Sequence, residues 1–223
     1  MKYLHVRSPI ATLSEDLYIR DNSAISLQDS IISFNTMGTT SAIKKSNKAP
    51  KKNYFISKID AKINREFFLT GRIDDDEYFI YDEVPAVKWQ IDESNTRKIA
   101  GYRCIKATAT IRGSKFTAYF APDLKYSAGP YKFYGLPGLI LDIREDNSNS
   151  NMWKAEKIEI NSSKEINYNP VFSGKTKITM TKFVEAKESR NNFELKKLNS
   201  NLPPGTRIET NNRLGTEKKY EWE

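Results

Sequence analysis

Residues 135–144 read Gly-Leu-Pro-Gly-Leu-Ile-Leu-Asp-Ile-Arg, a tight turn followed at once by an apolar strand. Proline at the second position of a turn fixes φ near the required value, and glycine at the third accepts the positive φ of a type II turn. The strand at 139–144 then carries apolar residues at every second position. The stretch therefore predicts abrupt entry into a sheet, with a structural rather than ligand-contacting role for Gly135, Leu136, Pro137, Gly138, Leu139 and Ile140.

Short apolar segments separated by polar turns fill most of the remaining chain. They predict strands at residues 3–6, 16–20, 25–34, 54–56, 66–70, 77–81, 88–91, 97–111, 115–120 and 153–160, with a polar loop at 36–52. The longest, 97–111, turns back at Arg112-Gly113-Ser114 into a hairpin. Consecutive strands joined by short turns indicate an antiparallel sheet.

The chain's later part contains one predicted helix. It runs from Lys182 to Leu198, with Thr181 as its N-cap. Beyond it the sequence is polar, although Tyr220 and Trp222 could dock on the rest of the protein. We expect one β-rich domain over residues 1–200 and a polar C-terminal tail over 201–223, because a chain of 223 residues can bury a real core as one unit. The predicted fold is mainly β, a curved antiparallel sheet or half-barrel with one C-terminal helix.

Three segments together carry a family resemblance: Ile99–Ala107 (IAGYRCIKA), Gly129–Phe133 (GPYKF) and Gly135–Ile140 (GLPGLI). On these motifs the chain resembles the GLPGLI family of secreted Bacteroidota proteins, for which no activity is established. The resemblance implies a GLPGLI-type domain in the periplasm or cell envelope. Members of that family typically carry an export signal, whereas residues 1–7 here lack the apolar core of a signal peptide, so the resemblance implies that the sequence is a trimmed, mature form.

Charge and hydropathy limit the partners. The formal net charge is +8, but of the two main groups of basic residues one lies in a polar loop at 44–52 and the other in a C-terminal region where glutamates are interleaved with them. Without a recognisable nucleic-acid motif, this mixture argues against a nucleic-acid partner and leaves an acidic surface or partner open. No apolar run approaches the roughly 18 residues of a membrane-spanning helix.

The sequence contains few of the residue patterns that usually mark a catalytic site. His5 is the sole histidine and Cys104 the sole cysteine, and both are interpreted as ordinary packed strand residues. The acidic run at 74–77 lacks the spacing of a calcium loop, and the glycines fit no nucleotide-binding loop. We therefore assign no catalytic residue, metal or cofactor. A carboxylate pair for hydrolysis stays open among residues that no spacing selects: Asp82, Glu83, Asp92, Glu93, Asp123, Asp142 and Glu145.

A cluster of aromatic residues gives the positive lead. Tyr126, Tyr131, Phe133 and Tyr134 occur within nine residues, so they either cap the open end of the core or form a binding surface. The function favoured by the sequence is an exported envelope binding or interaction module, with an outer-membrane or periplasmic protein as partner. The alternative is a half-barrel carrier of a hydrophobic ligand or peptide, and a carboxylate-dependent hydrolase comes third.

Overall fold

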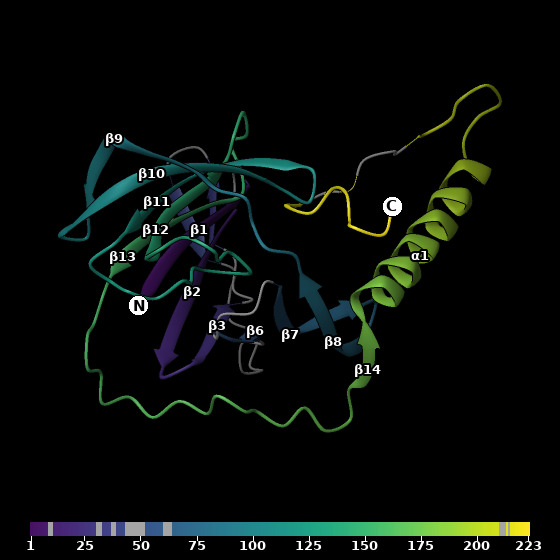
Figure 1. The fold of residues 1–223 in the computed structure, drawn as a ribbon. Helices are drawn as coiled ribbons and strands as arrows, with labels where there is room; N and C mark the ends of the chain where they lie inside the picture. The colour runs from purple at the N-terminus through teal and green to yellow at the C-terminus, as the bar shows by residue number, and fades with distance from the viewer. Residues whose placement is uncertain are drawn as a thin grey trace.

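The protein is a single large β-sheet with one helix beside it (Figure 1). This computed structural model describes residues 1–8, 11–29, 33–36, 39–42, 52–59, 64–209, 213 and 215–223. Twelve strands form one hydrogen-bonded path in the order β14-β8-β7-β6-β3-β2-β1-β13-β12-β11-β10-β9, and within the described residues this path is not closed. The prediction of a mainly β, curved sheet with one C-terminal helix is confirmed.

The strands agree in outline with the apolar segments of the sequence. They are β1 (Lys2–Ser8), β2 (Ala11–Arg20), β3 (Ser23–Asp29), β4 (Ser33–Thr36), β5 (Thr39–Ala42), β6 (Lys52–Lys58), β7 (Arg65–Ile73), β8 (Asp76–Val84), β9 (Gln90–Ile99), β10 (Tyr102–Ile111), β11 (Ser114–Ala121), β12 (Leu139–Glu145), β13 (Met152–Lys157) and β14 (Thr176–Thr179). The β4–β5 hairpin lies off the main path and pairs with β2. Most of the predicted polar loop at 36–52 lies outside the described residues.

The sheet curves strongly around residues 122–138, which connect β11 to β12. Six strand spacings separate β6 from β11, about 29 Å if the sheet were flat. The Tyr131 ring nevertheless lies 4.9 Å from that of Phe55 on β6, and the Phe133 ring lies 5.0 Å from that of Phe116 on β11. Since the Tyr131 and Phe133 rings are themselves 5.7 Å apart, one short segment spans the inner face of the curved sheet.

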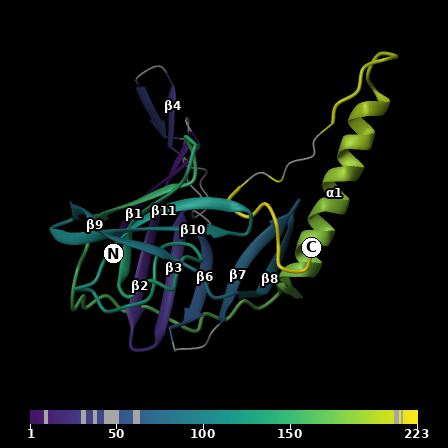
Figure 2. The ribbon, with the colours of Figure 1, turned by 45° about the horizontal axis from the view of Figure 1, so that its top comes forward.

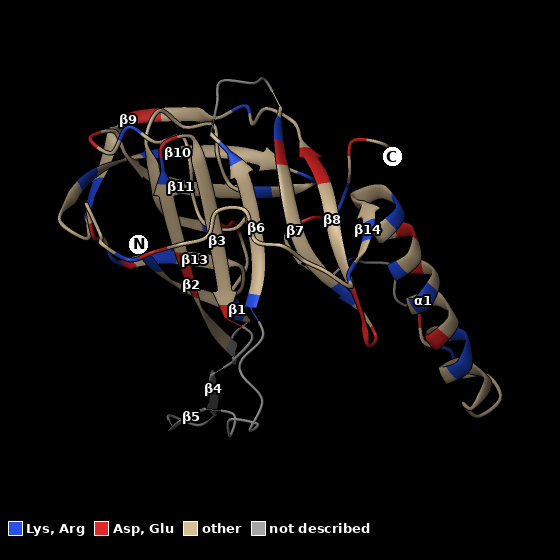
Figure 3. Ribbon diagram, turned by 90° about the horizontal axis from the view of Figure 1, so that it is seen from below, with Lys and Arg blue, Asp and Glu red and all other residues tan. Residues whose placement is uncertain are grey.

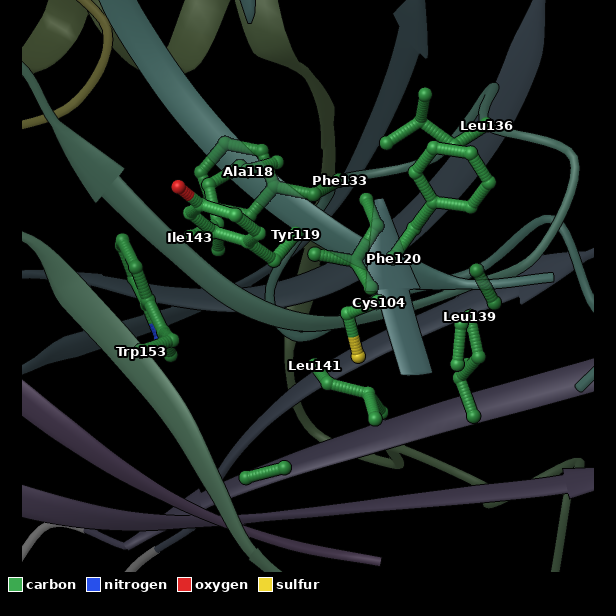
Figure 4. Packing of buried hydrophobic residues seen from close by; sticks show 14 of the residues in the cluster. Cys104, Ala118, Tyr119, Phe120, Phe133, Leu136, Leu139, Leu141, Ile143 and Trp153 are labelled. Atoms are coloured by element: carbon green, nitrogen blue, oxygen red, sulfur yellow. The ribbon is translucent and has the colours of Figure 1, made fainter. Parts of the chain in front are cut away.

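Large apolar side chains fill that inner face. Trp153, Tyr3, Phe116, Phe120 and Leu141 are all at most 2% exposed. Figure 4 shows the packing at close range, with Phe133 and Leu136 of the connecting segment among the side chains of β10 to β13. A second apolar cluster covers β6 to β8 and the start of the helix.

The helix differs from its prediction at its first residue. α1 runs from Met180 to Ser200, and its N-cap is Thr179, whose side-chain oxygen accepts a hydrogen bond from the backbone N–H of Lys182. The predicted cap, Thr181, was wrong because Met180 is already helical and buried. Buried residues of α1 occur only near its beginning, and its remainder projects away from the sheet (Figure 2). No helix in the described part of the chain combines the length and apolarity needed to cross a membrane.

The predicted long strand at 97–111 is two strands. β9 ends at Ile99 and pairs antiparallel with β10, which begins at Tyr102. The reversal lies at Ala100 and Gly101, which have φ angles of 47° and 91°. A further difference is β14, which the sequence did not predict and which pairs parallel with β8.

The predicted type II turn at Gly138 is also wrong, because this glycine does not have a positive φ. A Cβ atom placed on it would lie 2.4 Å from the carbonyl oxygen of Ala121 and 2.9 Å from the Cα of Pro122. Glycine is therefore needed for close approach of two backbones. The positive φ of the motif, 97°, belongs to Gly135.

Candidate functional site

The most concentrated group of buried charges lies where the two halves of the curved sheet meet. Arg112, in the β10–β11 turn, donates from Nη1 and Nη2 to the two carboxylate oxygens of Asp82 on β8, at 2.8 Å each. Eight strand spacings separate β8 from β11, about 38 Å in a flat sheet. This bidentate ion pair therefore bridges the open side of the sheet.

Lys132 brings a second cation to the same carboxylate. Its Nζ lies 2.7 Å from Asp82 Oδ2, and the side chains of Asp82, Arg112 and Lys132 are each at most 3% exposed. Burial acts to raise the pKa of Asp82, but Lys132 and Arg112 outweigh it and hold the pKa below its ordinary value. Two buried cations thus face one buried anion.

The missing negative charge comes from residues 215–223, which we call the tail segment. Its Glu217 accepts hydrogen bonds from Arg112 Nη1 at 2.6 Å and from the Tyr131 hydroxyl at 2.8 Å, and it forms an ion pair with Lys132. Its Glu221 accepts from Arg112 Nε and Nη2 at 2.9 and 3.0 Å. We call Asp82, Arg112, Lys132, Glu217 and Glu221 together the charged cluster.

Aromatic rings and backbone amides complete the docking of the tail segment. Tyr220 is 8% exposed and stacks on Trp222 with 4.5 Å between ring centroids, and the Arg112 guanidinium lies 4.8 Å from the Tyr220 ring. The backbone N–H groups of Lys218 and Lys219 both donate to the carbonyl oxygen of Arg112. In Figure 1 this yellow segment lies beside the end of the β10–β11 hairpin.

A second polar group, the Glu15 network, lies inside the core. The fully buried carboxylate of Glu15 accepts hydrogen bonds from Ser26, Gln28, the Trp153 indole and the backbone N–H of Tyr131. Burial raises the pKa of Glu15, although these hydrogen bonds oppose the rise. The carboxylate holds the segment 122–138 against β13, β2 and β3.

The predicted catalytic candidates occupy buried structural positions. His5 stacks on Trp153 at 4.0 Å, and its Nδ1 lies 2.9 Å from Gln28 Nε2. Burial lowers the pKa of His5 to about 3 and raises the pKa of the Cys104 thiol to about 11. Neither side chain has the protonation behaviour of a base or nucleophile at neutral pH.

The buried carboxylates among the predicted acidic candidates each have hydrogen-bonding partners. Asp142 accepts from Arg144, and Glu145 accepts from Ser114 and Asn151 and pairs with Lys218. Within the described residues, no group of three or more His, Cys, Asp or Glu side chains is placed to hold a metal ion. Acidic and basic residues are interspersed along α1, as Figure 3 shows.

The four predicted binding aromatics have different surroundings. Phe133 and Tyr134 are 3% and 4% exposed, Tyr131 is partly buried, and Tyr126 is 44% exposed. Tyr131 joins the two polar groups, since its backbone N–H donates to Glu15 and its hydroxyl to Glu217. The structure thus brings three of them together in the core region and leaves Tyr126 at the surface. Their role in binding stays a prediction.

Sequence reasoning missed the charged cluster. The contacts within it join residues that lie 30 to 109 positions apart along the chain, and no local spacing indicates them. One signal was present: Lys132 stands between Tyr131 and Phe133, in a segment whose neighbours were expected to be core or binding residues. A lysine enclosed by aromatic residues needs a buried anion as partner.

Comparison with known proteins gives a different family from the one that the sequence motifs suggested. The sequence model described as "N-glycanase peptide, N-terminal domain" matches residues 17–188. Two crystal forms of PNGF-II share the fold, at 13% and 14% identity and a TM-score of 0.51 for each, over 85% of this chain and 32% of theirs. The chain therefore spans about a third of the length of those structures. A search of curated proteins gives no match.

The resemblance to the GLPGLI family is accordingly wrong, as is the GLPGLI-type description of the domain. The six-residue run that suggested it has a local explanation, since Gly135 supplies a positive φ and Gly138 permits contact with the backbone of Ala121. The match extends over more than three quarters of the sequence. This chain belongs to the family of N-glycanase peptide N-terminal domains.

Proposed function

We propose that this chain is an exported, non-catalytic binding module that acts in the periplasm or at the cell envelope and binds an N-glycosylated polypeptide. One observation carries the proposal: the side chains best suited to acid–base or nucleophilic chemistry are used to hold the fold. His5 and Glu15 are bound to the core around Trp153, Cys104 is fully buried, and Asp82 is paired with two cations.

The comparisons support the choice of ligand class. The family description names an N-glycanase, and the chain spans about a third of the PNGF-II structures. A domain of this size beside a larger remainder fits an accessory role, in which one part of a protein binds and another part acts on the bound molecule.

The proposed binding surface surrounds Tyr126. Its backbone N–H donates to the carbonyl of Leu124 at 2.7 Å, and its own carbonyl accepts from Ala128 at 2.8 Å. The next residue, Ser127, is fixed by Arg65, whose Nη1 donates to its carbonyl at 2.6 Å. An exposed tyrosine on a backbone fixed in this way loses little entropy on binding, which is typical of residues that contribute strongly to interfaces.

A carrier of a hydrophobic ligand is less well supported. That function needs an open apolar cavity on the inner face of the sheet. The inner face is instead filled, since the Phe133 and Trp153 rings lie 5.2 Å apart and Leu136 is buried in the same apolar cluster.

The test compares two variants of the full chain. Tyr126→Ser should weaken binding to an immobilised N-glycosylated peptide at least tenfold, because aromatic residues at the centre of interfaces carry a disproportionate share of binding energy. Phe193→Ser, which changes a 58% exposed aromatic residue on α1, serves as the control and should leave binding unchanged. Equal binding by the parent and both variants, or no binding by the parent, would contradict the proposal.

A further inference from the structure

The tail segment contacts the rest of the protein as a bound ligand contacts a receptor. It contributes no strand to the sheet, and among residues 215–223 only Tyr220 is buried. Its attachment depends on the carboxylates of Glu217 and Glu221, the Tyr220 ring, two backbone amides, and the ion pairs Lys218–Glu145 and Glu223–Arg213. Segments that are held mainly by polar side chains and contribute no strand or helix lie toward the low end of local unfolding free energies.

The receptor side is complete without the tail segment. Arg112 and Lys132 are positioned by Asp82, and Arg112 also begins the turn into β11. Without the tail segment, these two cations and one carboxylate would leave a net positive charge at a site that the segment no longer covers. Excess positive charge at a surface attracts acidic partners, so this site favours an acidic ligand when the tail segment leaves.

The contacts of the tail segment define the ligand that would replace it. Glu217 meets both cations, Tyr220 three residues later fills a hydrophobic position against the β6–β8 cluster, and Glu221 next to it meets Arg112. A peptide of the pattern Glu-x-x-Tyr-Glu would reproduce all three. The chain's net charge of +8 would also attract an acidic partner.

We propose that Arg112 and Lys132 form a binding site for acidic peptides of this pattern, and that the chain's own tail segment occupies the site and is displaced when such a partner binds. This inference is independent of the Tyr126 surface. A tethered competitor acts at an effective concentration of about a millimolar or more. Acidic partners of modest affinity would therefore bind only when the tail segment is weakened or outcompeted.

The experiment uses the full chain with its three tryptophans replaced by fluorotryptophan. Each of the three gives a separate ¹⁹F NMR signal. The Trp222 signal, assigned with a Trp222→Phe variant, reports whether the tail segment is docked. The probe is a synthetic peptide with the sequence of residues 215–223, and the control peptide has glutamine in place of the two glutamates that match Glu217 and Glu221.

The parent should bind the probe weakly. The double variant Glu217→Gln, Glu221→Gln should bind it at least tenfold more tightly and should shift the Trp222 signal toward that of an undocked segment. Adding Lys132→Met should remove the gain, and the control peptide should bind neither protein. Tyr126→Ser should leave probe binding unchanged, which separates this site from the proposed function.

Two results would overturn the inference. One is a double variant whose Trp222 signal and probe affinity equal those of the parent, because the tail segment would then be a permanent part of the core. The other is an undocked tail segment without any gain in probe binding. If the double variant does not fold, Glu221→Gln alone carries the test, since this carboxylate is 36% exposed. About a threefold gain is expected from it, and none would count against the site.

Discussion

At the scale of single residues, the sequence indicated that Gly138 has a structural role, but the reason it gave was wrong. The sequence required glycine there because a turn was expected, whereas the structure requires it because the backbone of β11 passes too close for any side chain. A contact between segments 17 residues apart in sequence cannot be read from the local pattern. The Pro-Gly pair therefore predicted a turn followed by a strand, but it did not predict the backbone conformation of Gly138 or its contact with Ala121.

Gly138→Ala should destabilise the protein by about 2 kcal/mol, because the added methyl group would overlap the carbonyl of Ala121 and force the strands apart. Gly205→Ala is the control, since its surroundings are open and it costs only the strain of a positive φ, about 1 kcal/mol. Urea unfolding of both variants measures the difference. Equal losses would show that overlap at Gly138 is relieved without cost.

His5 should make stability depend on pH. Because burial lowers its folded pKa to about 3 from 6.5, the unfolded state binds the extra proton first, so stability is lost as pH falls through this window. Between pH 7 and pH 5 the loss from His5 should be about 2 kcal/mol. Glu15, with a raised pKa, acts in the opposite direction below its folded pKa.

A comparison of the parent with His5→Phe isolates this contribution. Phenylalanine keeps the stacking on Trp153, and Gln28 keeps its hydrogen bond to Glu15. Urea unfolding at pH 7 and pH 5 should show a loss that is smaller in the variant by about 2 kcal/mol. The same pH dependence in both proteins would mean that His5 titrates normally in the folded state.

Cys104 should be unreactive in the folded protein. It is fully buried and burial raises its thiol pKa to about 11, so both access and thiolate fraction limit its reaction. Labelling with a thiol reagent at pH 7.5 should be slow in buffer and complete within the mixing time in denaturant. Rapid stoichiometric labelling of the folded protein would reopen a redox role.

At the scale of elements, period-two patterns predicted most strands, because one face of each strand packs on the core. The exceptions have physical causes. The β9–β10 reversal uses Ala100 in a conformation that alanine rarely adopts, and β9 is largely exposed, so it lacks an apolar pattern of its own. β14 is short and exposed, and pairing with β8 rather than local propensity holds it in the sheet.

The buried apolar contacts of α1 come from its first turns, and these should dominate its attachment over exposed ion pairs such as that of Arg190 with Asp74. Phe183→Ala should cost about 3 kcal/mol, because the Phe183 ring is buried against the second apolar cluster and lies within 3 Å of the position a Cβ on Gly71 would occupy. Phe193→Ala should change the free energy of unfolding by less than about 0.5 kcal/mol. Similar losses for the two would mean that the outer part of α1 also packs on the protein.

At the scale of the whole molecule, the charged cluster holds the open sheet in its curved form. Replacing Arg112 with Met should cost about 3 kcal/mol, because Asp82, Glu217 and Glu221 would lose a common buried partner. Arg72→Met removes an exposed pair with Glu77 as a control and should cost less than about 1 kcal/mol.

Hydrogen exchange localises the effect. In Arg112→Met the backbone amides of β8 and of the β10–β11 turn should exchange faster than in the parent, since the bridge between the two halves of the sheet is broken. Unchanged exchange in both regions would mean that other contacts, and not the Arg112–Asp82 ion pair, hold the two halves of the sheet together. The sequence could not predict this bridge, because residues far apart along the chain meet there only after the sheet has curved.

We propose that this member of the family of N-glycanase peptide N-terminal domains binds a glycosylated polypeptide without acting on it. The most direct measurement is the mass of an N-glycosylated peptide during prolonged incubation with the purified full chain, at concentrations where complex formation is followed in the same native mass spectra. The account predicts a saturable complex and an unchanged peptide mass. Loss of the glycan with turnover, or the absence of any complex, would contradict it.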